Sequence, residues 1–255
     1  MSGAYQQRNQ PPGVPPLELT GERTLPDVPA ENYWYRRHLA VYRWIAQRCA
    51  GGRVVDMACG EGYGSAILAQ WAADVVGVDA NPEAHEHARL RYTAPNLRFE
   101  RDLVEQFDDG APWDAIVFLQ TIEHVTEAGA LLERFAGLLT PGGVAYISTP
   151  NRLTLAPPGA ERSGNPWHVR EYVAAEYREL LEPHFSDVEL LGLFHARRLR
   201  AHEIALRLGW DRVHPALGLS RPFYDRFVPA ISERDFALRE DGLDRALDFL
   251  AVCRP

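Results

Sequence analysis

The chain has 255 residues, 46% of them hydrophobic, and a formal net charge of −8 at pH 7. A general nucleic-acid binder carries a basic surface, so this charge argues against that class. All 27 residues counted as lysine or arginine are arginine, which excludes a catalytic lysine. The three cysteines form no C-x-x-C pair and no even set, so we expect free thiols and a cytoplasmic protein.

The first 30 residues are rich in proline and show little periodicity, which predicts a flexible N-terminal arm over residues 1–30. This segment is polar and lacks the pattern of a secretory signal. No apolar run in the chain approaches the roughly 18 residues that span a bilayer. Residues 31–255 are expected to form one domain that begins with an aromatic, arginine-rich helix over residues 31–50.

Strands and helices alternate from residue 53 onward, which favours an α/β fold with a mostly parallel sheet and helices on both faces. Residues 195–243 are predicted to be a helical insertion before the last strand. Such an insertion would hang over the carboxyl edge of the sheet, where ligands bind in open α/β folds. Strands are expected at 53–57, 74–79, 97–100, 113–119, 143–149, 187–194 and 246–252, and helices at 63–73, 82–91, 127–139 and 172–183.

A glycine-rich turn follows the first of these strands. Gly60, Gly62 and Gly64 are spaced G-x-G-x-G, and Ser65 stands where the dinucleotide pattern G-x-G-x-x-G has its last glycine. Such a turn lets backbone N–H groups approach a ligand at a helix N-terminus. Asp79 closes the next strand, where a carboxylate can accept hydrogen bonds from two vicinal ribose hydroxyls.

These residues resemble the S-adenosylmethionine (SAM) site of class I methyltransferases. The resemblance implies a Rossmann-like sheet of seven strands that ends in an antiparallel hairpin, with SAM as cofactor. Asp102 corresponds to the acid that contacts adenine, with Glu100 and Asp108 as competitors. Arg37 or His38 is expected near the methionine carboxylate, and Cys59 is expected to pack in the turn. The full set of expected cofactor residues is Asp56, Ala58, Cys59, Gly60, Glu61, Gly62, Gly64, Asp79, Ala80, Asp102, Leu103, Gln120 and Arg37.

The fourth strand is followed by Glu123 and His124, at the position that faces the transferable methyl group in this fold. Methyl transfer is an in-line displacement that needs alignment and removal of a proton from the acceptor. Histidine, with a pKa near about 6.5, is a suitable base. The alternative is that this pair caps or packs the following helix. Some quinol O-methyltransferases hold a divalent ion here with a Glu-x-x-Glu-His run. In this chain Gln120 replaces the first acid of that run, so we expect no metal. If a metal such as Mg²⁺ does bind, Glu123 and His124 are its candidate ligands.

A second polar group follows the fifth strand. Trp167 can stack on a sugar ring, and charged planar groups can bond vicinal hydroxyls, so this loop suits a sugar acceptor. His168 is a second candidate base. The expected acceptor-binding residues are Asn151, Trp167, Arg170, Glu171 and His195. The remaining histidines, His85, His87, His184, His202 and His214, are expected at the surface without partners.

Several motifs outside the turn extend the likeness over most of residues 17–255. They are Thr20–Asp27, Glu31–His38, Ser148–Arg152, Asn165–His168 and Gly192–His195. They resemble actinobacterial sugar O-methyltransferases linked to polymethylated polysaccharides, the methylglucose lipopolysaccharides and methylmannose polysaccharides of mycobacteria. The resemblance implies a hydroxyl of a glucoside or mannoside oligosaccharide as acceptor. The sequence leaves the oligomeric state open, with a homo-oligomer as a candidate. A metal-dependent quinol or phenol O-methyltransferase and a non-catalytic SAM-binding protein remain the alternatives.

Overall fold

The computed structural model describes residues 4–5, 7, 9–20, 23–157, 159–210, 213–214 and 220–255. Its main feature is a sheet of eight strands in the order β5-β4-β3-β6-β7-β10-β8-β9. Strands β5 to β7 are parallel, and β10 runs antiparallel to both of its neighbours. The strands are β3 (Arg53–Met57), β4 (Asp74–Val78), β5 (Leu97–Glu100), β6 (Trp113–Leu119), β7 (Leu139–Pro150), β8 (Asp187–His195), β9 (Phe236–Arg239) and β10 (Asp248–Arg254).

This order confirms the predicted class I methyltransferase fold. The difference is β9, which pairs antiparallel with β8 and adds an edge strand inside the segment predicted to be helical. The sequence Phe236–Arg239 is too short to show a strand by its own pattern. The pairing partner, supplied by the tertiary structure, makes it one.

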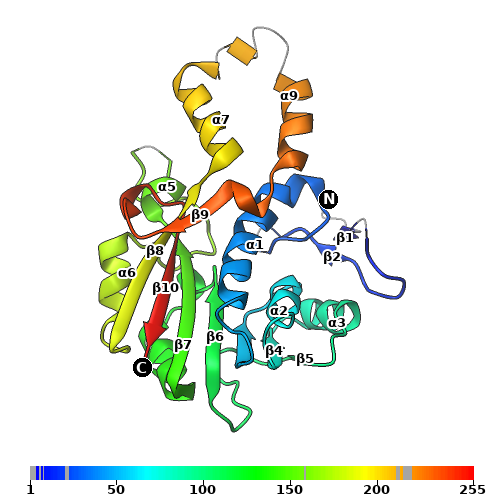
Figure 1. Cartoon of the computed structure of the whole chain (residues 1–255), viewed down its shortest axis with the longest axis vertical. Coiled ribbons are helices and arrows are strands. Elements are labelled where there is room, and N and C mark those ends of the chain that lie inside the picture. Colours follow the sequence, from blue (N-terminus) through cyan, green and yellow to red (C-terminus); the bar gives the residue numbers. More distant parts are fainter. Residues whose placement is uncertain are drawn as a thin grey trace.

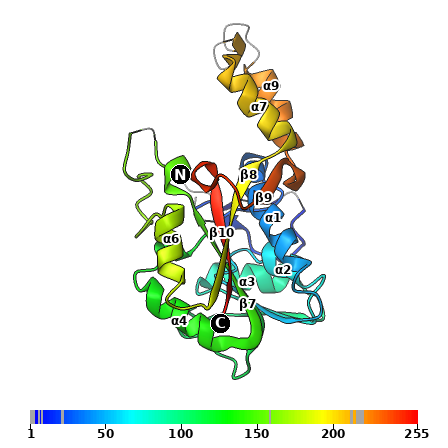
Figure 2. The same ribbon diagram turned by 60° about the vertical axis from the view of Figure 1, so that its left-hand side comes forward.

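Helices cover both faces of the sheet (Figures 1 and 2). Helices α1 (Asn32–Ala46), α2 (Tyr63–Leu68) and α3 (Pro82–Arg91) lie on one face, and α4 (Ala128–Leu138) and α6 (Ala174–Leu181) lie on the other. The inner strands are therefore buried on both sides, which explains the nearly continuous apolar run in β6. A short helix, α5 (Arg152–Leu155), follows β7.

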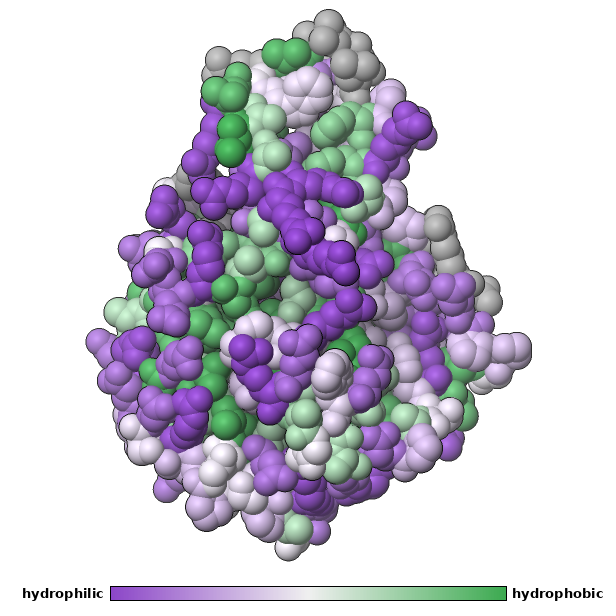
Figure 3. Space-filling model, viewed as in Figure 1, coloured by the Kyte–Doolittle hydropathy of each residue, from purple (hydrophilic) through white to green (hydrophobic). Residues whose placement is uncertain are grey.

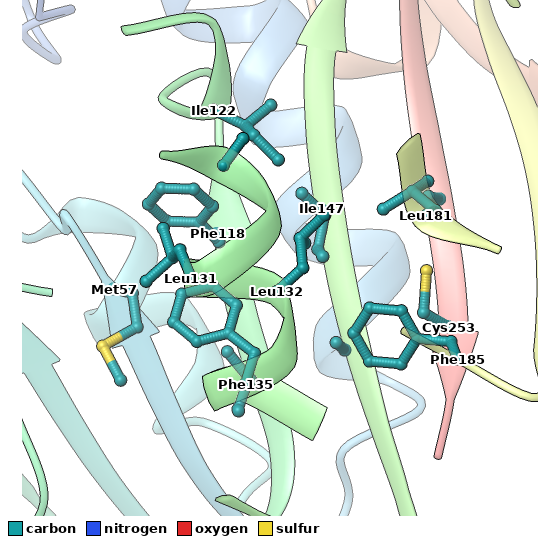
Figure 4. Close-up of a cluster of buried hydrophobic side chains, with 14 of the residues drawn as sticks. Met57, Phe118, Ile122, Leu131, Leu132, Phe135, Ile147, Leu181, Phe185 and Cys253 are labelled. Atoms are coloured by element: carbon teal, nitrogen blue, oxygen red, sulfur yellow. The ribbon is translucent and has the colours of Figure 1, made fainter. Parts of the chain in front are cut away.

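The core under α4 shows how the sequence drives this packing (Figure 4). Leu131, Leu132 and Phe135 fall on one helical face and are at most 2% exposed. The ring of Phe135 meets that of Phe118 on β6 edge to face, with centroids 5.3 Å apart. Burial of each such side chain contributes about 1.5–3 kcal/mol to stability.

The described part of the N-terminal segment is packed, which corrects the prediction of a flexible arm. Strands β1 (Ala4–Tyr5) and β2 (Leu17–Glu18) pair with each other, and Leu17, Leu25 and Val28 form a buried cluster. The carbonyl of Pro15 lies 2.6 Å from Nδ1 of His87. Periodicity gave no sign of this segment's order, because its apolar residues are few and its contacts are to distant parts of the chain.

The insertion forms an arm that projects from the body beyond β8 and β9 (Figures 1 and 2). It contains α7 (Arg197–Arg207) and α9 (Ser220–Phe227). The ring of His202 stacks on Phe223 at 5.8 Å and donates to or accepts from Tyr224 at 3.1 Å, so this histidine has partners. Short 3-10 helices η1 (Pro29–Glu31), η2 (Ile122–His124), η3 (Val228–Ala230), η4 (Glu233–Asp235) and η5 (Leu243–Arg245) complete the chain.

Candidate functional site

A pocket lies at the carboxyl ends of β3, β6 and β7, where ligands bind in open α/β sheets. Its floor comes from the turn after β3 and the residues after β6. Its outer wall comes from the N-terminal segment, α1 and the start of β10, which are far apart in sequence. The lining residues include Arg23, Thr24, His38, Ala58, Cys59, Gly60, Glu61, Tyr63, Gln120, Thr121, Ser148 and Asp248.

A second pocket adjoins the first, because Ala58 and Thr121 line both. It contains Asp79, Ala80 and Leu103 from the ends of β4 and β5, together with His124. The two pockets together form an elongated site of the kind that an extended cofactor needs. Asp102 is not among the lining residues, and its carboxylate accepts from the backbone N–H of Leu103 at 2.8 Å.

Two non-glycine residues in the site adopt left-handed backbone conformations: Ala58 has φ of 57° and Gln120 has φ of 52°. Such conformations cost roughly 1 kcal/mol or more and persist where the surrounding structure enforces them, often at functional sites. Gln120 is held by Ser148, whose hydroxyl accepts from its backbone N–H at 3.1 Å and from its side-chain amide at 3.0 Å. Gln120 therefore lines the first pocket as a fixed wall.

The glycine turn has three different requirements. Gly60 and Gly62 have φ of 57° and 93°, where L side chains are strained. A Cβ on Gly62 would also lie 2.8 Å from that of Ala88. Gly64 has ordinary backbone geometry, but a Cβ there would lie 2.1 Å from the ring of Tyr42. Gly64 thus allows α1 to pack closely on α2. It does not line either pocket, whereas the sequence had suggested that it contacts the cofactor directly.

Asp79 shapes the turn before any ligand binds. Its Oδ2 accepts from the N–H of Gly60 at 2.8 Å, and its Oδ1 accepts from the N–H of Asn81 at 2.9 Å. Each carboxylate oxygen has a second lone pair, so hydroxyl groups of a ligand can still donate to it. The carboxylate thus connects the glycine turn of the first pocket to the wall of the second.

Asp56 is an internal support. It is fully buried and accepts from the hydroxyls of Tyr42 at 3.1 Å and Ser65 at 2.7 Å. Burial raises the pKa of Asp56 to about 7. It holds α1 and α2 to the end of β3 without lining either pocket, in contrast to the cofactor contact expected from the sequence.

Glu61 lines the first pocket, but its carboxylate is only 1% exposed and is already bonded. It accepts from the amide of Gln7 at 3.0 Å and the hydroxyl of Tyr92 at 2.8 Å, and lies 3.1 Å from Nε2 of His87. His87 is therefore fully buried and bonded, not the partnerless surface residue that was expected. Glu61 holds the N-terminal segment and α3 together beneath the turn.

The buried thiol of Cys59 agrees with a packing role. Cys59 clusters with Ala88 and Phe99, and burial raises the pKa of its thiol. A raised pKa disfavours the nucleophilic thiolate.

Arg37 does not face the site. Its guanidinium is buried and forms an ion pair with Asp248 of β10, with Nε donating to Oδ2 at 2.6 Å. The basic residues of the N-terminal segment and α1 that line the pocket are Arg23 and His38. Burial lowers the pKa of His38 to about 4, so this imidazole is neutral at pH 7. The sequence did not single out Arg23, although this residue lies in the motif Thr20–Asp27. Nothing in that motif shows that the segment folds over the ends of the strands that form the pocket.

The structure brings Glu123, His124 and His168 together, with one potential ligand atom from each within 4.8 Å of the others. The rings of His124 and His168 meet edge to face at 4.9 Å. Glu123 is 2% exposed and accepts from the hydroxyl of Thr149 at 3.1 Å. Two segments thus converge: η2, after β6, and the loop that follows α5.

The environment of each histidine fixes which nitrogen carries its proton. Nδ1 of His124 lies 3.0 Å from the carbonyl of Trp167, which can only accept, so Nδ1 is the donor in this contact. Nδ1 of His168 lies 2.8 Å from the carboxylate of Glu171. Burial alone would raise the pKa of Glu171, but hydrogen bonds from Ser163 and His168 outweigh it and lower this pKa below the ordinary value. Glu171 therefore stays ionised and accepts a hydrogen bond from the Nδ1–H group of His168.

The other expected acceptor-binding residues divide into three groups. Trp167 is 64% exposed, and its backbone carbonyl contacts His124. Arg170 is exposed, with its guanidinium 5.1 Å from the ring of Tyr172, and neither residue lines the two pockets. Asn151 is fully buried, and its amide donates to the carbonyls of Leu243, Asp244 and Ala246, so it joins β7 to η5 and has no acceptor-binding geometry. His195 lies in a different cleft, between Tyr33 and Glu203.

Fold and site together define a methyltransferase of the SAM-dependent class, and comparison with known proteins agrees. The methyltransferase domain family model matches residues 33–203. A probable S-adenosylmethionine-dependent methyltransferase of Mycolicibacterium smegmatis is 38% identical over 246 residues, covering 92% of this chain and 94% of that protein. A possible histamine N-methyltransferase of Thermotoga maritima has a similar fold, with a TM-score of 0.57, 14% identity and coverage of 88% of this chain and 93% of that one.

The chain therefore belongs to the methyltransferase domain family, with SAM as its cofactor. A ubiquinone biosynthesis O-methyltransferase of Xylella fastidiosa is 36% identical over 113 residues, which cover 42% of this chain and 45% of that protein. Within the residues described, no helix combines the length and apolar character needed to cross a membrane.

Proposed function

We propose that this methyltransferase transfers the methyl group of SAM to a hydroxyl of a mannoside or glucoside oligosaccharide. The observation that supports this most is the position of His124. It lines the pocket that holds Asp79, contacts the ring of His168, and is fixed by the carbonyl of the exposed Trp167. The residue whose backbone holds this candidate base thus also carries an exposed aromatic ring, and an aromatic face stacks well on a sugar ring.

The cofactor is proposed to lie along the two pockets. Its ribose would donate to Asp79 in the second pocket, and its methionine end would lie in the first, among Arg23, His38 and Gly60. Arg23 takes the place that sequence analysis gave to Arg37, since a guanidinium can bind the methionine carboxylate. A neutral His38 adds no charge beside the sulfonium.

The reaction then follows from the side chains. Bound SAM would supply the methyl group to the acceptor oxygen by in-line displacement, in which the carbon–sulfur bond breaks and its electron pair leaves with sulfur. The hydroxyl proton passes to Nε2 of His124 or His168, because Nδ1 of each ring is already protonated. Positioned general bases of this kind contribute about a hundredfold or more to the rate. Full activity of both the His124→Ala and the His168→Ala variant would exclude the base assignment.

The same cluster also fits a divalent cation. One carboxylate and two imidazoles converge, and each imidazole has its other nitrogen bonded to a carbonyl or carboxylate, as metal-bound histidines do. No metal was expected from the sequence, because Gln120 replaces an acid. In the structure, His168 from a distant loop supplies a third potential metal ligand. This mixed donor set suits Mn²⁺, Fe²⁺ or Zn²⁺ better than Mg²⁺. A cation held there would occupy the Nε2 atoms of both histidines, so it would replace the histidine base and would instead lower the pKa of an acceptor hydroxyl.

A quinol is the second candidate acceptor. The similarity of 42% of this chain to a ubiquinone biosynthesis O-methyltransferase favours it, as does the fit of the cluster to a metal. The experiment is transfer of a labelled methyl group from SAM to short mannosides, short glucosides and a quinol, each with and without a chelator. Transfer to one sugar series supports the proposal, and transfer to the quinol alone overturns it. The chelator arm tests the metal separately from the acceptor.

A further inference from the structure

A second cleft, apart from the methyl-transfer site, lies where the helical arm meets the sheet. Its walls are α7, the end of β8, the end of β9 and the loop that leads to β10. Four arginines from three segments line it: Arg200 and Arg207 of α7, Arg239 of β9 and Arg245 of η5. Figure 3 shows hydrophilic side chains gathered at this junction of arm and body. We call these four residues the arginine cleft.

The arginine cleft lacks the ion pairs that neutralise many other arginines of this chain. Among the described residues, no carboxylate lies within 4.0 Å of these four guanidinium groups, whereas pairs such as Arg98–Asp74 and Arg152–Glu176 lie at 3.0 Å. The guanidinium of Arg239 instead lies over the ring of Phe194 at 4.0 Å. The four arginines outnumber the two acids that line the same cleft, so positive charge is in local excess within a chain of net charge −8.

The two acidic residues that line the cleft, Glu203 and Asp241, form no ion pair with these arginines. Glu203 lies between Arg200 and Arg207 on the same face of α7, at the i+3 and i−4 positions that favour helix ion pairs. Its carboxylate is 2.6 Å from Nδ1 of His195, which Tyr33 holds from the other side at 2.7 Å. Asp241 also lines the cleft, and no guanidinium of the described residues lies within 4.0 Å of it.

We propose that the arginine cleft binds a polyvalent oxyanion, a phosphate or polycarboxylate group of a small molecule. Several guanidinium groups that face one space repel each other, and a multivalent anion relieves that repulsion. Guanidinium also matches the geometry of phosphate and carboxylate oxygens with two parallel hydrogen bonds. The cleft therefore has the chemistry of an anion site that is distinct from the cofactor pocket and goes beyond the proposed acceptor chemistry.

The anion has two sources. Leu247 lines the arginine cleft, and the next residue, Asp248, lines the first cofactor pocket, so the two spaces lie on either side of one backbone position. A charged end of a long acceptor would occupy the cleft while its hydroxyl reaches the methyl group. A separate small anion would occupy the cleft without touching the acceptor. The binding chemistry is the same in both cases.

The test uses the full chain and inorganic pyrophosphate, measured by isothermal titration calorimetry at low salt. S-adenosylhomocysteine is present at saturation, so that the cofactor pocket is filled. The wild type is compared with the double variant Arg239→Gln/Arg245→Gln. The control is Arg89→Gln/Arg254→Gln, which removes the same charge from exposed pairs with Glu86 and Asp187 elsewhere. Thermal unfolding of each variant checks that it is folded.

We expect pyrophosphate to bind the wild type and the control equally, and to bind the cleft variant at least about tenfold more weakly. Absence of wild-type binding, or equal weakening in the control, would overturn the proposal. A second arm compares a mannoside that carries a terminal phosphate with its neutral counterpart in methyl transfer. A lower KM for the charged acceptor, lost in the cleft variant, identifies the acceptor as the source. Equal KM values with retained pyrophosphate binding identify a separate anion. Because binding is measured without turnover, failure of the sugar proposal leaves this result intact.

Discussion

The imidazole of His168 lies 2.8 Å from the carboxylate of Glu171, and the two side chains are only 8% and 2% exposed. Ser163 holds the same carboxylate, with its backbone N–H donating at 2.9 Å. A bonded carboxylate behind an imidazole fixes the orientation and tautomer of the ring. This arrangement makes Glu171 a positioning residue for His168, and the sequence had suggested that it binds the acceptor directly.

Glu171→Gln is expected to lower kcat by about tenfold to a hundredfold, with little change in the KM for the acceptor. The amide keeps the size of the side chain but loses the charge that holds Nδ1–H. Initial rates over a range of acceptor concentrations check this. If the acceptor KM rises while kcat is unchanged, Glu171 binds the acceptor after all.

Arg23→Gln and Arg37→Gln are expected to have opposite effects. Loss of Arg23 from the pocket wall should weaken SAM binding by about tenfold or more, with an unchanged melting temperature. Loss of Arg37 leaves Asp248 buried and unpaired, which should cost about 3–5 kcal/mol of stability. Calorimetric titration with SAM and thermal unfolding separate the two. A SAM affinity that is unaffected in Arg23→Gln would remove Arg23 from the cofactor site.

Gly64→Ala is expected to destabilise the protein by about 1–3 kcal/mol or more, because the new methyl group would meet the ring of Tyr42. The control is Gly137→Ala in α4, where a Cβ meets no atom within 4 Å and the higher helix propensity of alanine is worth up to about 1 kcal/mol. Denaturant unfolding measures both. Equal stability of the two variants would contradict the close packing of α1 on α2.

Stability should depend on pH through His38. Its pKa is lowered to about 4 in the folded chain, against about 6.5 when unfolded. Between these values the unfolded state binds a proton that the folded state does not, so the free energy of unfolding falls as pH falls from 6.5 to 4. His38→Gln removes this contribution, and its unfolding free energy should fall less steeply over the same window. Parallel curves for variant and wild type would show that His38 titrates normally.

Mn²⁺ is expected to raise the melting temperature by roughly 5–10 °C at about a hundred times its Kd, through the cluster of Glu123, His124 and His168. His124→Ala and His168→Ala should abolish this shift, because each removes one of the three converging donors. His184→Ala, outside the cluster, is the matched control and should keep it. A shift that persists in both cluster variants would place the metal elsewhere.

Local patterns in the sequence were enough to predict the fold and the cofactor turn. Apolar runs that alternate with helical segments predicted the parallel strands, and the spacing of Gly60, Gly62 and Asp79 predicted a SAM-binding turn. Both features depend on residues that are close together in the sequence, so a local pattern reveals them. It also indicated that Glu123, His124 and His168 carry chemistry, since each stands after a strand or in a polar loop at the ligand-binding edge.

Which polar side chains face the pockets, and which are used in internal hydrogen bonds, could be read only from the three-dimensional contacts. Arg37, Asp56 and Asn151 have the right chemical groups in the right region, yet their hydrogen bonds are already made to Asp248, Tyr42 and the loop before β10. The packing of the N-terminal segment and the pairing of β9 with β8 also appear only in the three-dimensional structure. The physical reason is that burial and hydrogen-bond partners come from residues distant in sequence, and no local pattern contains them.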